Sequence, residues 1–303
     1  MNETQPPKRR GPGRPPSKPI TPHIEQCGIV EAPSDAANSF ELLYKDPSIF
    51  KAIFTFFKNL KTHDIFVHCD PKGMKFFGRD RSKISRVCAY IDGSKVNWYY
   101  CDGEIQIGFN REHVEGVFTS IDKSFYKIML TYSREDADNF NVTFKDPELD
   151  KECRYRVATS NLEPDAELFS IQEDTCDTSL TQFPVQFSLT NKQLKKTISD
   201  AGNYISSIII EKFEHEPLRF SYSKIGIICY DEIYHDSKKI KLESDVKQGQ
   251  QFRCPIKLAN IKSFSSSMIT DAIRILCRED ADILFKSSID DQTLIIYTLT
   301  KLS

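Results

Sequence analysis

Lysines at helical spacing are the residues of this 303-residue chain best suited to bind a ligand. Lys51, Thr55 and Lys58 occupy positions i, i+4 and i+7, which share one face of a helix. Lys192 and Lys196 form a similar polar stripe further along the chain. An ammonium group binds phosphate by charge and reads no base, so such faces favour contact with a nucleic-acid backbone. An ordinary solvated helix face is the alternative for any one of these segments.

The formal net charge of −2 hides an uneven distribution. Residues 1–20 carry +4, so the other 283 residues carry −6. The four segments of helical period together carry +6, which leaves −12 on the strands and loops. If the four helices share one side of a sheet, that side is a basic lining on an acidic body, and it would hold nucleic acid through phosphates.

The N-terminal segment is basic and rich in proline, and we predict that residues 1–38 are disordered. Its Gly13-Arg14-Pro15 core resembles an AT-hook, in which arginine enters the minor groove of A·T-rich DNA. Pro12 stands where the usual motif has its first arginine. A plain basic tail or a nuclear-import signal therefore stays open. The predicted DNA contacts of the tail are Arg9, Arg10, Arg14 and Lys18.

Motifs for other chemistry are missing from the sequence. It contains no glycine-rich phosphate loop, no HExxH and no Cys/His set with metal-ligand spacing, so we expect no enzyme, no cofactor and no metal. The nine cysteines are scattered, which favours a reduced intracellular protein over a disulfide framework. No apolar run is long enough for a membrane span, and no secretory signal is expected.

The elements that must position the lysines form an α+β pattern that occurs twice. The predicted helices are Pro47–Lys61, Asn110–Ile121, Thr190–Tyr204 and Pro255–Met268. The predicted strands are Asp64–Cys69, Ser85–Ile91, Val96–Cys101, Tyr126–Tyr132, Asn139–Phe144, Cys153–Thr159, Ile205–Glu211, Leu218–Tyr222, Gly226–Tyr230, Lys239–Leu242, Ala272–Cys277, Asp282–Lys286 and Thr293–Thr300. We therefore predict one domain over 39–160, an exposed connector over 161–183 and a second, similar domain over 184–303.

Particular stretches resemble the family of DNA sliding clamps, proliferating cell nuclear antigen. They are Gly73–Asp80, Tyr99–Asp102, Ile107–Asn110 before the second helix, and Leu194–Asp200 in the third. The Gly-Pro-Gly-Arg-Pro-Pro run in the tail is most similar to the clamp-like proteins of asfarvirus-type large DNA viruses. The resemblance covers about residues 40–303, and it depends on the order and spacing of the stretches together.

The resemblance implies antiparallel sheets outside and four short helices inside, closed into a ring as a homotrimer around double-stranded DNA. It places inward basic residues at Lys51, Lys58 and Lys196. From helix phase we add the candidate DNA contacts Lys61, Arg111, Lys192, Lys195, Lys257 and Lys262.

Edge strands are expected to join the subunits, because pairing satisfies backbone groups that would otherwise invite aggregation. The predicted pair is Cys153–Thr159 on one subunit and Lys239–Leu242 on the next. The interface residues are then Tyr155, Val157, Ile240 and Leu242.

The resemblance also implies a pocket beneath the connector in which short motifs of client proteins bind. The matching positions are Arg79, Lys83, Leu168, Phe169, Ile171, Tyr297 and Leu302. Arg79 and Lys83 replace a methionine and a histidine of the family, so a more basic pocket with altered client preference is expected.

The function that follows from the resemblance is that of a DNA polymerase processivity factor, which tethers replication and repair proteins to DNA in the host cytoplasm or nucleus. Two alternatives stay open: a monomeric processivity factor held on DNA by charge, and an architectural DNA-binding protein that uses the AT-hook-like tail.

Overall fold

The structure is a computed structural model that describes residues 38–119, 121, 125–146, 148–160, 162, 168, 179–203, 205–224, 228–237, 240–268, 270–278, 283–291 and 293–299. The predicted tail contacts and the pocket residues Phe169, Ile171 and Leu302 lie outside these ranges. Within them, no helix is long and apolar enough to cross a membrane.

The two halves of the chain contain the same series of elements. The first half holds β1 (Phe40–Tyr44), α2 (Ser48–Asn59), β2 (Thr62–Asp70), β3 (Gly73–Asp80), β4 (Ser85–Asp92), β5 (Trp98–Cys101), β6 (Ile105–Asn110), α3 (Arg111–Thr119), β7 (Lys127–Tyr132), the short 3-10 helix η1 (Arg134–Asp136), β8 (Asn139–Asp146) and β9 (Lys151–Ala158). The second half holds β10 (Val185–Thr190), α5 (Asn191–Gly202), β11 (Ser207–Phe213), β12 (Leu218–Lys224), β13 (Ile228–Tyr234), β14 (Leu242–Ser244), β15 (Gln251–Lys257), α6 (Leu258–Ser267), β16 (Ala272–Cys277), β17 (Ile283–Ser288) and β18 (Thr293–Leu299). Apart from η1, the described residues of each half form a strand, a helix, five strands, a helix and three strands.

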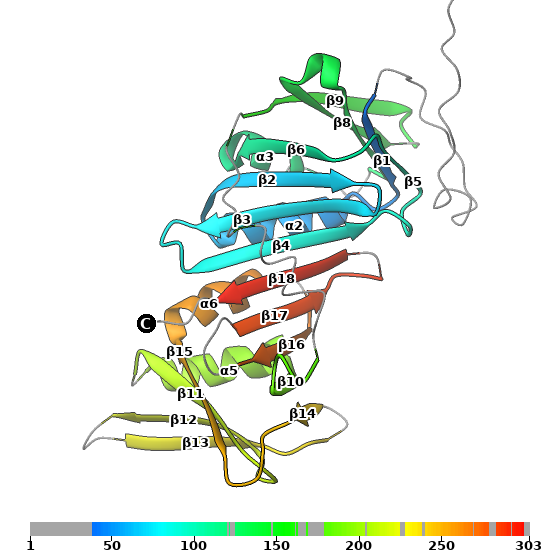
Figure 1. Cartoon of the computed structure of the whole chain (residues 1–303). Helices are drawn as coiled ribbons and strands as arrows, with labels where there is room; N and C mark the ends of the chain where they lie inside the picture. Colours follow the sequence, from blue (N-terminus) through cyan, green and yellow to red (C-terminus); the bar gives the residue numbers. More distant parts are fainter. Residues whose placement is uncertain are drawn as a thin grey trace, which may run out of the picture.

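The strand order shows how the two halves are joined. A five-stranded sheet has the order β5-β1-β7-β8-β9, and a four-stranded sheet has the order β13-β12-β11-β15. Between them lies a nine-stranded sheet, β14-β10-β16-β17-β18-β4-β3-β2-β6. The antiparallel pairing of β18 with β4 fuses the halves in its middle, with Thr293 opposite Ile91 and Leu299 opposite Ser85. Figure 1 shows the resulting elongated molecule, with β9 near one end and β13 at the other.

Local sequence explains the start of α5. Thr190 caps α5 in a reciprocal capping box with Gln193, as Ser/Thr followed three residues later by Glu/Gln predicts. The predicted start of the fourth helix at Pro255 is wrong, since Pro255 lies in β15 opposite Ile209 and α6 begins at Leu258. Strands β1, β3, β6, β10 and β15 were not among the predicted strands, although parts of β3 and β6 carry the family resemblance.

Aromatic side chains hold the helices on the large sheet. Phe54 of α2 and Phe118 of α3 stack with ring centroids 4.1 Å apart. Gly78 of β3 allows α2 to approach closely, because a Cβ atom there would lie 2.6 Å from Cε1 of Phe57. A second, smaller apolar cluster lies apart from this core and contains Phe77, Cys88, Leu168, Phe183, Leu276, Leu284 and Ile296.

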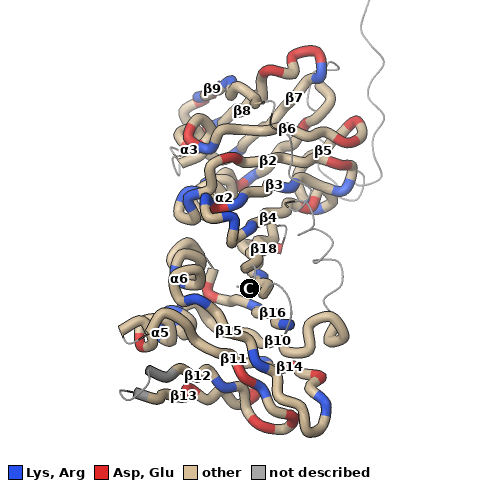
Figure 2. The backbone as a smooth tube through the Cα atoms, turned by 60° about the vertical axis from the view of Figure 1, so that its left-hand side comes forward, with Lys and Arg blue, Asp and Glu red and all other residues tan. Residues whose placement is uncertain are grey.

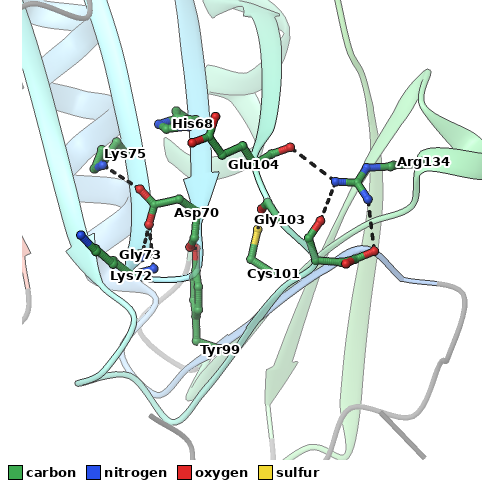
Figure 3. A network of polar contacts seen from close by, with 11 residues as sticks. His68, Asp70, Lys72, Gly73, Lys75, Tyr99, Cys101, Gly103, Glu104 and Arg134 are labelled. Atoms are coloured by element: carbon green, nitrogen blue, oxygen red, sulfur yellow. Dashed lines mark hydrogen bonds and ion pairs between the residues drawn. The ribbon is translucent and has the colours of Figure 1, made fainter. Parts of the chain in front are cut away.

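A polar network ties the large sheet to the loop between β5 and β6 (Figure 3). Lys75 Nζ lies 2.8 Å from Asp70 Oδ2, and Tyr99 donates a hydrogen bond to the Asp70 carbonyl oxygen. Arg134 binds Asp102 on the far side of the same loop. Burial raises the pKa of Cys101 to about 12, which favours the protonated thiol at neutral pH.

Candidate nucleic-acid interface

The four helices form one continuous row. Packing contacts join α3 to α2, α2 to α6, and α6 to α5. Figure 1 shows all four behind the sheets, and in the turned view of Figure 2 they lie along one side of the molecule. The prediction that the helices share one side is confirmed.

Helix α2 presents its lysines away from the sheet. Six of its apolar residues are buried, whereas Lys51 and Lys58 are exposed. Lys51 Nζ donates a hydrogen bond of 2.9 Å to the carbonyl oxygen of Ile121. Lys61 follows the helix with a φ of 57°, a left-handed conformation that is uncommon for lysine, and its side chain is exposed.

Helices α5 and α6 add a second group of cations to the same row. Lys192, Lys195 and Lys196 are exposed on α5, and Leu194, Ile198 and Ala201 are buried beneath them. Lys257 and Lys262 are exposed at the start and in the middle of α6. In the part of the chain that the structure describes, no carboxylate forms an ion pair with any of these five lysines or with Lys61. These cations are available to a polyanion.

Arg111 does not join this group. Its side chain is only 15% exposed, its Nε donates to the carbonyl oxygen of Thr62, and its guanidinium pairs with Glu115. The helix phase placed Arg111 correctly on α3, but the i, i+4 pair with Glu115 turns its charge inward. Glu115 also binds Lys58, an interaction that the helical pattern alone did not identify.

The sheet edges show which strands are open to pairing. Strand β9 is an edge strand, Tyr155 is 39% exposed, and Val157 is buried. Leu242 lies in β14, which pairs with β10 and forms one edge of the large sheet, whereas Ile240 is buried within the chain's own core and is not open to a partner. One open edge of the second small sheet is β13, where Ile233 is 48% exposed.

Two residues of the predicted partner pocket, Arg79 and Lys83, line the same cavity. A pocket of about 320 Å³ is lined by His63, Asp64, Phe66, Arg79, Asp80, Arg81 and Lys83. Leu168 is buried in the small apolar cluster with Phe77 and Ile296. Tyr297 is misplaced in the prediction: its ring stacks on Phe264 of α6, and its hydroxyl donates to Ser85, so it belongs to the helix side of the sheet.

A chain of two matching halves, fused edge to edge with four helices along one side, has the fold of a DNA sliding-clamp subunit. The solved structure of proliferating cellular nuclear antigen from Entamoeba histolytica agrees with this, with a TM-score of 0.69 and 15% identity over 88% of this chain and all of that one. The model for the N-terminal domain of proliferating cell nuclear antigen matches residues 39–168.

Close relatives by sequence are viral. An uncharacterized protein of African swine fever virus is 42% identical over 293 residues, which cover 96% of this chain and 97% of its own length, in isolates from Kenya and from Malawi. The chain belongs to the proliferating cell nuclear antigen family, and the protein of African swine fever virus is its relative over nearly the whole length. The matches described here include no family of enzymes.

Proposed function

We propose that three copies of this chain close into a ring around duplex DNA and act as a sliding clamp for a viral DNA polymerase. The observation that carries the proposal is the internal seam between β18 and β4. Strand β9 has in the first half the place that β18 has in the second, and β13 corresponds in the same way to β4. Among the strands at sheet edges, β9 and β13 are therefore the counterparts of the two that pair in the middle of the chain.

Head-to-tail pairing of β9 with β13 of the next copy would repeat the internal seam between subunits. Such a heterologous contact closes a ring when its rotation closes. Three chains of two halves each would give six similar units, and the row of helices on each chain would line the hole.

Charge supports the same pairing. Strand β9 carries Lys151, Arg154 and Arg156 against one acid, Glu152, for a net charge of +2. Strand β13 carries Asp231 and Glu232 and no base, for a net charge of −2. Opposite charge on two edges steers association and disfavours pairing of an edge with itself.

The helices would supply the contacts with DNA. Their exposed lysines, Lys51, Lys58, Lys61, Lys192, Lys195, Lys196, Lys257 and Lys262, bind phosphates without reading bases, so the ring stays on DNA yet moves along it. Client proteins, including a polymerase and repair factors, would dock on the pocket at Arg79 and Lys83, wherever viral DNA is replicated in the host cell.

The test is topological. Duplex DNA is anchored at one end, and its other end is left free or is blocked by a bulky protein after the chain has been added. A clamp that encircles DNA slides off the free end in high salt and stays on the blocked DNA. Equal loss from both DNAs would contradict encirclement and would favour a monomer held by charge.

The tail is tested with a chain that lacks residues 1–20. If DNA binding then disappears altogether, the architectural alternative applies. A ring held by the helices would lose only part of its affinity.

A further inference from the structure

The chain enters the described part of the structure at a well-bonded corner of the first domain. The N–H of Ser39 donates a hydrogen bond of 2.8 Å to the carbonyl oxygen of Tyr132, and the carbonyl oxygen of Ser39 accepts one of 2.8 Å from the N–H of Asp102. The Ser39 hydroxyl also accepts from the N–H of Arg134 at 3.2 Å. Residues 1–37 are therefore attached at a fixed point, and we call Asn38 and Ser39 the tail root.

The tail root and the predicted partner pocket lie at opposite ends of the large sheet. Asp102, which binds the root, belongs to the loop before β6, and β6 begins with Ile105 opposite Cys69, near the end of β2. The pocket is lined by Asp64, near the start of β2. Figure 1 shows the same arrangement, with β1 and β5 on the right and the end of β18 beside the C-terminus on the left.

These two ends of the sheet become the two faces of the proposed ring. Subunits that join through β9 and β13 place the circumference of the ring across the strands of the large sheet. The ends of these strands then point to the flat faces of the ring, because the helices occupy the side of the hole. The tail root therefore lies on one face, and the partner pocket lies on the other.

The surface around the tail root is acidic. Two loops meet there, residues 102–104 and residues 133–138, and they contain five acids and one base, for a net charge of −4. All six side chains are exposed, namely Asp102, Glu104, Arg134, Glu135, Asp136 and Asp138. The base is already bound, since Arg134 pairs with Asp102. This corner by itself repels the phosphates of a duplex that leaves the hole.

The segment in front of the root has the opposite charge. Its cations are Lys8, Arg9, Arg10, Arg14 and Lys18, which we call the basic tail. Twenty residues separate Lys18 from Asn38, and a chain of this length spans at most about 70 Å. The basic tail can therefore reach past the acidic corner to DNA outside the hole. DNA is the stronger partner of the two, because it carries a charge about every 1.7 Å and releases counterions when it is bound.

We infer that the basic tail binds duplex DNA where it leaves the ring, on the face opposite the partner pocket. Its cations contact phosphates, so the tail moves along the duplex with the ring. The pocket face stays free, and a client and the tail act on the two sides of one clamp at the same time. The inference depends on the proposed function as a ring, and it assigns the tail a place on the DNA.

The test first fixes the direction of the clamp on DNA. A sequence-specific zinc-finger domain is joined to the C-terminus of the full-length chain by a short linker, and a long duplex carries one recognition site. Strand β18 ends at Leu299 opposite Ser85, and Ser85 binds Asp80 of the pocket lining. The pocket face is therefore turned toward the recognition site.

A photo-crosslinking amino acid then reports which side of the clamp each residue faces. It replaces Ser17 in the tail, Ser82 in the turn beside the pocket, or Ala137 in the acidic corner, one at a time. Ser82 and Ala137 are exposed, so both replacements keep the core intact. The positions of the cross-links on the DNA are mapped by primer extension.

We expect Ser82 to cross-link between the recognition site and the clamp, and Ala137 to cross-link beyond the clamp. Ser17 should cross-link on the Ala137 side and farther out. Replacing the five tail cations by Gln should abolish the Ser17 cross-links. The slope of log affinity against log salt should then fall in magnitude by up to about 4.5, which is 0.9 for each cation. Lys241→Gln with Lys247→Gln, a pair of exposed lysines outside the tail, is the control and should change neither result.

Ser17 cross-links on the Ser82 side, or equally on both sides, would overturn the inference. So would cross-links from Ser17 to residues 102–104 or 133–138 in place of DNA, because the acidic corner would then hold the tail. A clear separation of Ser82 from Ala137 shows that the ring encircles the DNA, so in those cases this inference fails alone. If Ser82 and Ala137 cross-link to the same side, the proposed function fails as well.

Discussion

Lys58 of α2 and Glu115 of α3 form an ion pair with 2.5 Å between Nζ and Oε1, on the side of the molecule that carries the basic helices. Glu115 also pairs with Arg111, so this acid contacts two cations at once. In the proposed clamp, DNA would compete with Glu115 for Lys58. This acid would therefore lower the affinity for DNA and help to keep the clamp mobile.

Replacing Glu115 by Gln should raise affinity for duplex DNA about two- to fivefold, the effect of releasing an exposed ion pair. The measurement is fluorescence anisotropy with labelled duplex at several salt concentrations. Glu112→Gln is the control, since Glu112 is 73% exposed on the same helix and does not hold Lys58. Equal gains in both variants would mean that only net charge matters.

Converting Lys51, Lys58 and Lys196 together to Glu should lower DNA affinity sharply. The slope of log affinity against log salt should fall in magnitude by about 0.9 for each phosphate that the variant no longer binds, with native mass unchanged. The control converts Lys72, Lys241 and Lys247, which are exposed lysines outside the four helices. If the control set weakens binding as much, the helices are not the surface that faces DNA.

Reversing the charge of one sheet edge should break the ring, and placing an arginine on the opposite edge should restore it. Arg154→Glu with Arg156→Glu places acids on β9 opposite the acidic β13, and like charges across an interface oppose association. Adding Asp231→Arg restores an attractive pair. The readout is native mass, with circular dichroism as a check of folding. A β9 variant that stays assembled would exclude β9 from the interface.

Asp70→Asn should destabilise the fold by about 3 kcal/mol at neutral pH, because Lys75 would lose its nearly buried partner. Although burial by itself raises the pKa of Asp70, hydrogen bonds from Lys75 and from the backbone N–H groups of Lys72 and Gly73 lower it below its ordinary value of 3.8. A lowered pKa stabilises the fold above that value, and the contribution is lost as the pH falls through the pKa of the folded protein.

Urea unfolding at pH 7 and pH 3 measures this difference. Asp102→Asn is the control, because Asp102 is 64% exposed in its pair with Arg134 and should cost less than about 1 kcal/mol. An equal loss in both variants at pH 7 would contradict the structural role of the Asp70–Lys75 pair.

The helices were the most predictable part of the fold. The helical period of apolar residues identified α2, α3 and α5, and lysines at helical spacing identified the exposed cations on α2 and α5. It could not reveal that Arg111 is withdrawn, although its spacing to Glu115 was a signal for an i, i+4 pair.

The strand errors come from missing alternation. In β18 the run Leu294, Ile295, Ile296 and Tyr297 is apolar on both faces, so the sequence does not show which face meets the helices, and Tyr297 was placed in the wrong pocket wall. The edge strand β13 contains charged residues, and its predicted range, Gly226–Tyr230, was too short. The equivalence of β9 with β18 became visible only through the strand pairing.

The central claim is closure of three chains into a ring, and native mass by light scattering across a range of concentrations tests it most directly. A closed ring predicts three times the chain mass of 34.9 kDa, about 105 kDa. Separation into single chains of 34.9 kDa is expected for the variant with Arg154→Glu and Arg156→Glu. A wild-type chain that stays at 34.9 kDa at every concentration, with and without DNA, would contradict the ring.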